Sequence, residues 1–147
     1  MPIYNILNKI DFVNRYKNIC ELYKKQEEPF NIKQDLIKEI LFSFDDSIKY
    51  VSKERMFISK YQITDTEINL GLEFKYGYIT ARLYYIVKDE WIIYNRFDFI
   101  AKELNSNYDR SRYSLPIFNN KEDLSEILTH FFSIYNDIKK ELKFANI

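Results

Sequence analysis

Two consecutive segments of alternating polarity constrain the fold of this chain more than any other feature. Residues Ile68–Lys75 alternate strictly between apolar and polar side chains, and Tyr78–Val87 again places apolar residues at every second position. A period of two puts successive side chains on opposite faces of an extended strand, so each segment predicts a half-buried β-strand. Only Tyr76-Gly77 separates the two segments, which predicts a tight hairpin turn.

The apolar residues of the two segments select one register for this hairpin. On one side every apolar residue meets an apolar partner: Phe74 faces Ile79, Leu72 faces Ala81, Leu70 faces Leu83 and Ile68 faces Tyr85. On the other side Glu73 meets Thr80 and Gly71 meets Arg82. A slip of one residue would turn the apolar set toward solvent, so this matching supports the hairpin.

Two further strands extend the hairpin into a four-stranded antiparallel meander. One runs from about Arg55 to Ile63 and the other from Trp91 to Phe97, each next to a short polar turn. In the last strand we expect Trp91, Ile93 and Phe97 to face inward, because the opposite choice would bury two charged side chains, Arg96 and Asp98.

Amphipathic helices are expected at both ends of the chain. Apolar spacings of three and four residues predict one helix from about Asn8 to Gln26, and a second, capped by Asn31, that continues to Phe44. A third begins after Asn119 or Asn120, with acidic residues in its first turn and lysines in its last, as the helix dipole favours. Its apolar stripe comprises Leu124, Ile127, Leu128, Phe131, Tyr135, Ile138 and Leu142.

Together these elements predict one α+β domain over residues 1–147. It would contain a four-stranded antiparallel meander sheet, two N-terminal helices and one C-terminal amphipathic helix. A length of 147 residues suits a single domain, and 2 Gly and 3 Pro leave no room for a flexible linker.

The sequence contains no residue set with a recognised catalytic or metal-binding spacing. His130 is the only histidine and falls on the solvent side of the C-terminal helix, so neither a catalytic triad nor a zinc site is expected. Cys20 lies among apolar helical residues, as a buried structural thiol does. We therefore expect no catalytic residues, no metal and no cofactor. A carboxylate-based enzyme, whose two acids would be distant in sequence, stays open as an alternative.

The balance of charges bears on the class of partner. Lys plus Arg total 22 and Asp plus Glu total 22, so no overall field attracts nucleic acid or anionic lipid. A small regulatory or nucleic-acid-associated module would need its lysines gathered on one face. Near-neutral charge also favours self-association, so a homodimer is one option. No segment approaches the roughly 20 apolar residues of a membrane span, and a cytoplasmic location is expected.

Two surfaces are candidates for binding a partner protein. The polar loop Asn105–Pro116 carries two Tyr and two Arg, the residue types that dominate protein–protein hot spots. Its candidate contacts are Tyr108, Asp109, Arg110, Arg112 and Tyr113; the alternative is a solvated loop with a tyrosine folded back onto the core. The outward face of the second hairpin strand presents Tyr78, Arg82 and Tyr84, which would need a cover if helices occupy only the other face.

The layout of the chain resembles small immunity proteins of bacterial polymorphic and contact-dependent toxin systems. The likeness lies in the two N-terminal helices, the Tyr-rich meander, the polar loop and the segment Leu115–Leu124 that opens the final helix. The resemblance implies a cytoplasmic protein without catalytic activity. Such a protein binds a cognate toxin domain and neutralises it by occlusion.

Overall fold

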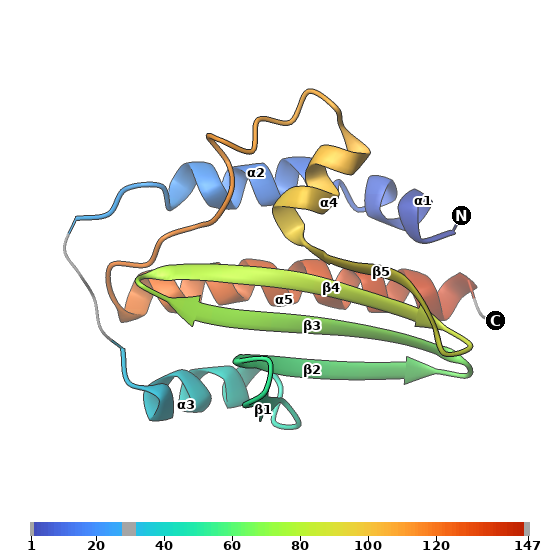
Figure 1. The fold of residues 1–147 in the computed structure, drawn as a ribbon, viewed down its shortest axis with the longest axis horizontal. Coiled ribbons are helices and arrows are strands. Elements are labelled where there is room, and N and C mark those ends of the chain that lie inside the picture. The colour runs from blue at the N-terminus through green and yellow to red at the C-terminus, as the bar shows by residue number, and fades with distance from the viewer. Residues whose placement is uncertain (1, 28–31, 146–147) are drawn as a thin grey trace.

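The computed structural model describes residues 2–27 and 32–145, which form an α+β fold in two layers (Figure 1). One layer is a five-stranded antiparallel sheet in which every strand pairs with the next in the chain. Its strands are β1 (Lys49–Val51), β2 (Met56–Ile63), β3 (Thr66–Lys75), β4 (Tyr78–Val87) and β5 (Glu90–Arg96). The helices are α1 (Pro2–Lys9), α2 (Phe12–Leu22), α3 (Gln34–Phe44), α4 (Phe97–Leu104) and α5 (Lys121–Ala145).

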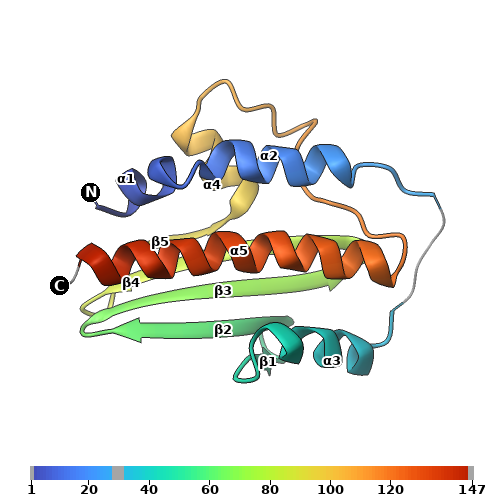
Figure 2. The same ribbon diagram turned by 180° about the vertical axis from the view of Figure 1, so that it is seen from behind.

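The helical layer covers one face of the sheet. Figure 2, seen from behind, shows α5 in front of the sheet and running along the direction of the strands, with α1 and α2 beside it. Helices α1, α2 and α3 each contact α5, whereas α4 contacts α2, β4 and β5 at one end of the sheet. We call the covered side of the sheet the inner face.

The central hairpin forms in the predicted register. Leu70 lies opposite Leu83 and Gly71 opposite Arg82, so the apolar residues of β3 and β4 share the inner face. In the two-residue turn, Tyr76 has φ 54° and Gly77 has φ 81°. Positive φ at both turn residues suits the twist of a hairpin, and Gly77 adopts it without steric strain.

The sheet has five strands where four were expected. Lys49–Val51 adds the short strand β1, which pairs with Met56–Ile58 at the edge of β2. Three residues are too few to display a period of two, so the polarity pattern gave no sign of this strand.

The single helix expected from Asn8 to Gln26 is corrected: α2 spans only Phe12–Leu22, and a separate helix that was not expected, α1 at Pro2–Lys9, precedes it. Asp11 adopts a left-handed conformation with φ 61° and ψ 43°, and it separates α1 from α2. The apolar spacing continues across the break, because Leu7 and Phe12 are both buried. The spacing of apolar residues shows which side chains face the core. A kink that keeps the same side of both helices on the core does not alter this spacing, so the sequence pattern does not reveal the kink.

Helices α3 and α4 also differ from the expectations. Helix α3 begins at Gln34, and the N-cap expected at Asn31 lies outside the described residues. Helix α4 is not among the three expected helices; it begins at Phe97, directly after β5.

Helix α5 supplies the largest part of the core beneath the sheet. All seven residues of its predicted stripe are buried, with none more than 2% exposed. The Tyr135 hydroxyl lies 3.1 Å from the Ser59 carbonyl oxygen and 2.9 Å from that of Ile68, and it donates to them. At the start of the helix, Asn120 accepts the Asp123 N–H at 2.7 Å, which confirms the predicted cap. Helix α5 is thus anchored to β2 and β3 by packing and by a buried polar contact.

Replacing Leu70 by alanine should lower the free energy of unfolding by about 2–5 kcal/mol, because Leu70 is fully buried and its loss leaves a cavity. Chemical denaturation measures the change. The control is Leu22→Ala, since this leucine is 69% exposed and its loss should change stability by less than about 0.5 kcal/mol. Equal losses in both variants would contradict the assigned core.

The thiol of Cys20 should resist modification in the folded protein. Burial raises its pKa to about 12, and the residue is 2% exposed, which confirms the buried position expected from the sequence. At pH 8 we expect a disulfide reagent to label Cys20 about a hundredfold or more slower in the native protein than in guanidinium, because the thiolate is the reactive form. Fast labelling of the native protein would show that α2 does not stay packed.

Candidate functional site

The loop between α4 and α5 is folded against the helices. Its two tyrosines, Tyr108 and Tyr113, are only 4% and 8% exposed and belong to the main core. The Tyr108 hydroxyl donates to the Tyr113 carbonyl oxygen at 2.8 Å. The alternative in which a tyrosine folds back onto the core thus describes both residues. Their side chains anchor the loop and offer little surface to a partner.

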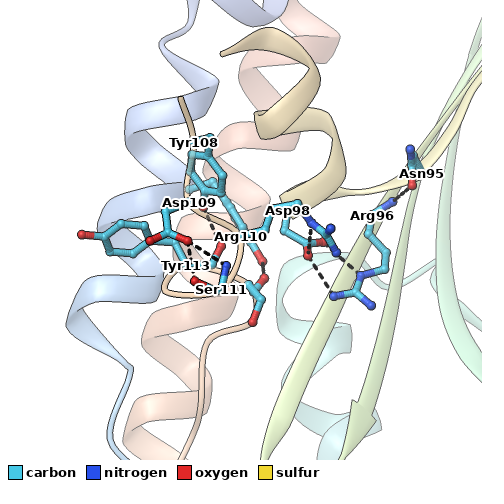
Figure 3. Close-up of polar contacts among 10 residues, drawn as sticks. Asn95, Arg96, Asp98, Tyr108, Asp109, Arg110, Ser111 and Tyr113 are labelled. Atoms are coloured by element: carbon cyan, nitrogen blue, oxygen red, sulfur yellow. Dashed lines mark hydrogen bonds and ion pairs between the residues drawn. The ribbon is translucent and has the colours of Figure 1, made fainter. Parts of the chain in front are cut away.

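The polar residues of this loop have different surroundings. The exposed Asp109 accepts hydrogen bonds from the Ser111 N–H at 3.0 Å and the Ser111 hydroxyl at 2.5 Å, a local turn (Figure 3). Arg112 has a side chain 61% exposed and lies 3.8 Å from the Glu21 carboxylate. Arg110 instead donates to Asp98. The other four candidates, Tyr108, Asp109, Arg112 and Tyr113, line one polar pocket of about 250 Å³ against α2. The structure thus brings four of the five loop candidates together and leaves Arg110 out of that group.

A buried carboxylate at the start of α4 binds two arginines (Figure 3). Asp98 is 0% exposed and accepts bonds from Arg96 Nε at 3.0 Å and Nη2 at 2.9 Å. Arg110 Nε adds a third bond at 3.3 Å, and its guanidinium lies 3.5 Å from the centre of the Phe99 ring. The expectation that Asp98 would avoid the interior is wrong. Its burial is tolerated because a bidentate arginine neutralises it.

The face of the sheet opposite the helices is uncovered in the described part of the chain (Figure 1). We call it the open face. The strand pairing places on it Lys49 and Val51 of β1, Met56, Ile58, Lys60 and Gln62 of β2, Glu67, Asn69, Gly71, Glu73 and Lys75 of β3, Tyr78, Thr80, Arg82, Tyr84 and Ile86 of β4, and Trp91, Tyr94 and Arg96 of β5. The three candidates Tyr78, Arg82 and Tyr84 thus lie on the side predicted for them.

Tyr84 forms the base of an aromatic cluster on the open face. It is 3% exposed, and its hydroxyl donates to the Met56 sulfur at 3.0 Å. A Cβ atom at Gly71 would lie 2.9 Å from both the Tyr84 ring and the Met56 sulfur, so glycine is what lets these side chains lie flat across β3. Burial raises the pKa of Tyr84, and the neighbouring Tyr94 and Glu54 raise it further, so the hydroxyl stays protonated.

Two exposed aromatic residues complete the cluster. Trp91 and Tyr94 are 58% and 52% exposed, and their ring centres lie 5.3 Å apart. Tyr94 is 4.8 Å and Trp91 is 6.0 Å from the ring of Tyr84, within the range of favourable aromatic pairs. We define the aromatic cluster as Tyr84, Trp91 and Tyr94.

Sequence reasoning missed this cluster because of a β-bulge. Tyr85 pairs with Ile93 but Ile86 pairs with Trp91, so Ile92 is an extra residue in β5. The insertion turns Trp91 to the open face, which corrects the inward position expected for it, whereas Ile93 faces inward as predicted. In a regular strand Trp91 and Tyr94 would lie on opposite faces, and alternation alone gives no sign of a bulge.

A groove of about 210 Å³ lies beside the aromatic cluster. It is lined by Val51, Glu54, Ile58, Lys60, Glu67, Asn69, Tyr84, Ile86 and Trp91. Acidic and basic side chains therefore stand next to apolar ones along this part of the face. Two of the lining residues, Tyr84 and Trp91, are of the aromatic types enriched where proteins contact each other.

The remaining candidates add no second site. His130 lies exposed on α5, as its place outside the apolar stripe predicted. Within residues 2–27 and 32–145, no three His, Cys, Asp or Glu side chains gather as a metal site would require. Among the helices of the same residues, none combines the length and apolar character needed to cross a membrane.

Replacing Asp98 by asparagine should destabilise the protein by about 3 kcal/mol, because it leaves two guanidinium groups beside a neutral buried amide. The control is Asp109→Asn, which keeps the side-chain acceptor for Ser111 on an exposed aspartate of the same loop. Urea denaturation should give near-native stability for this control. An equally stable Asp98→Asn protein would show that the ion pairs do not hold α4 and the loop in place.

Comparisons with protein-family models, with curated proteins and with solved structures found no match to this chain. What the protein binds is therefore inferred from its own surface.

Proposed function

We propose that the protein binds another protein through its open face and acts as an inhibitor of the immunity type. In this role it would act in the cytoplasm and neutralise a cognate toxin domain by occluding it. The observation that carries the proposal is the exposure of Trp91 and Tyr94 on the buried Tyr84. Large aromatic side chains that remain more than half exposed on an uncovered sheet favour a protein partner.

The setting of the cluster supports this role. Tyr84 is fixed by Met56 and by the space above Gly71, so the two exposed rings rest on a rigid base. A preorganised surface loses little conformational entropy on binding, and rigid aromatic rings bury much area at low entropy cost. The open face is thus suited to a stable complex.

The charges of the open face favour a protein over a nucleic acid. Glu67 and Glu73 of the central strand β3 interrupt the cations of this face, so no continuous positive path crosses it. The cations are Lys49, Lys60, Lys75, Arg82 and Arg96. A phosphate backbone requires a positive potential along its path. A protein surface, with its own mixture of charges, can match this one.

The test compares the tagged native chain with the double variant Trp91→Ala/Tyr94→Ala in cells of the source organism. We expect one stoichiometric protein to co-purify with the native chain and to be lost with the double variant, since hot-spot aromatics contribute about 2–4 kcal/mol each. Phe144→Ala is the control, because Phe144 is 60% exposed but belongs to α5. All three proteins should have the same melting temperature.

The captured protein is then tested for toxicity. Expressed alone it should arrest growth, and co-expression with the native chain should restore growth whereas the double variant should not. Capture of a second copy of this chain, of nucleic acid, or of a partner that the double variant still retains would refute the proposal.

A further inference from the structure

An arginine without an acidic partner lies next to the aromatic cluster. Arg82 of β4 stands directly opposite Arg96 of β5, and both side chains are on the open face. Like charges in directly opposed positions repel each other. Arg96 is neutralised by Asp98, but within the described residues no carboxylate forms an ion pair with Arg82.

The Arg82 side chain is also incompletely satisfied inside the protein. Its Nε atom is buried and has no hydrogen-bond partner. Buried donors are almost always paired, so an unpaired charged donor calls for an explanation. The described part of the protein therefore offers this donor no acceptor.

The surrounding charges leave this end of the open face positive. Arg96 and Arg110 share the single carboxylate of Asp98, and Arg82 lies beside Arg96. Three guanidinium groups thus accompany the single carboxylate of Asp98, and on the neighbouring strand Glu73 and Lys75 of the same face offset each other. We call Arg82, Arg96 and Arg110 the arginine row.

We propose that Arg82 receives a carboxylate of the partner, so that the partner presents an acidic segment, Asp or Glu beside apolar residues, to this end of the open face. A guanidinium binds a carboxylate through pairs of N–H donors. Because the Nε of Arg82 is buried, the pair with a partner would form through the Nη groups at the tip of the side chain. The pair Tyr84–Tyr94 adjoins the pair Arg82–Arg96 in the sheet, so apolar residues of the same segment would contact the aromatic cluster.

A carboxylate fits this position better than a phosphate of a nucleic acid. Glu67 and Glu73 stand on the same face, and Glu54 lines the groove beside the aromatic cluster. They would repel a continuous phosphate backbone that crosses the face, whereas a protein can place one carboxylate at Arg82 and other groups elsewhere. The inference rests on the proposed function insofar as the partner is a protein.

The first experiment observes Arg82 directly in the intact protein. In a ¹H–¹⁵N correlation spectrum the Arg82 Nε–H signal is identified by its absence in Arg82→Met. Addition of pentaglutamate should shift this signal and the neighbouring amides of β4 and β5, and the shifts should diminish as salt is added. In Arg82→Met the affinity read from the amides should fall about tenfold or more.

Two controls make the result specific. Lys140→Met removes an exposed cation from α5 and should bind pentaglutamate like the native protein. Arg82→Met should melt at the native temperature or above it, because it removes an unpaired guanidinium opposite Arg96. An Arg82 signal unmoved by pentaglutamate, or unchanged affinity in Arg82→Met, would overturn the inference. The inference would also be overturned if an oligonucleotide of eight thymidines bound more tightly than pentaglutamate and lost this affinity in Arg82→Met, because the site would then be a phosphate site.

Failure of this inference is distinguishable from failure of the proposed function. If the capture assay loses the partner with Trp91→Ala/Tyr94→Ala but retains it fully with Arg82→Met, the open face binds a protein and the carboxylate assignment is wrong. If no partner is captured, the proposed function fails, and the titration alone decides whether Arg82 is a carboxylate site.

Discussion

The packing of α5 against the β3–β4 hairpin is the contact on which the rest of the structure depends. It buries the alternating apolar residues of both strands, and Tyr135 ties the helix to two strand carbonyl oxygens. Because side chains alternate across a sheet, burying one set exposes the other. The choice of inner face therefore determines which residues form the open face, and the helices α1, α2 and α3 that contact α5 leave that face uncovered.

The buried Asp98 connects the edge of the sheet to the loop before α5. It binds Arg96 at the end of β5 and Arg110 in the loop between α4 and α5. One carboxylate therefore fixes two segments that helix α4 separates in the chain. The same arrangement leaves the arginine row with more positive than negative charge. The ion pairs of Asp98 thus lie beside the proposed binding position: Asp98 neutralises Arg96, whereas the cross-strand neighbour Arg82 forms no ion pair in the described part of the chain.

The open face carries two features, exposed aromatic residues and an unpaired arginine, each of which is common on protein surfaces by itself. Here they lie on adjacent cross-strand pairs of one rigid sheet. The loop that the sequence singled out has a different role. Tyr108 and Tyr113 are core residues, and hot-spot residue types in a polar segment do not reveal whether their side chains face solvent or the core.

The sequence by itself determined the α+β class, the hairpin register, the stripe of α5 and its cap at Asn120, because each follows from a local period or a local hydrogen bond. It also placed Tyr78, Arg82 and Tyr84 on one face, since alternation in β4 is regular. Only the tertiary structure decided the break at Asp11, the edge strand β1, the bulge at Ile92 and the ion pairs of Asp98. These features depend on single residues or on contacts between distant segments, and such contacts leave no periodic pattern in the chain. The aromatic cluster depends on the bulge, so the surface on which the proposed function rests exists only in the folded protein.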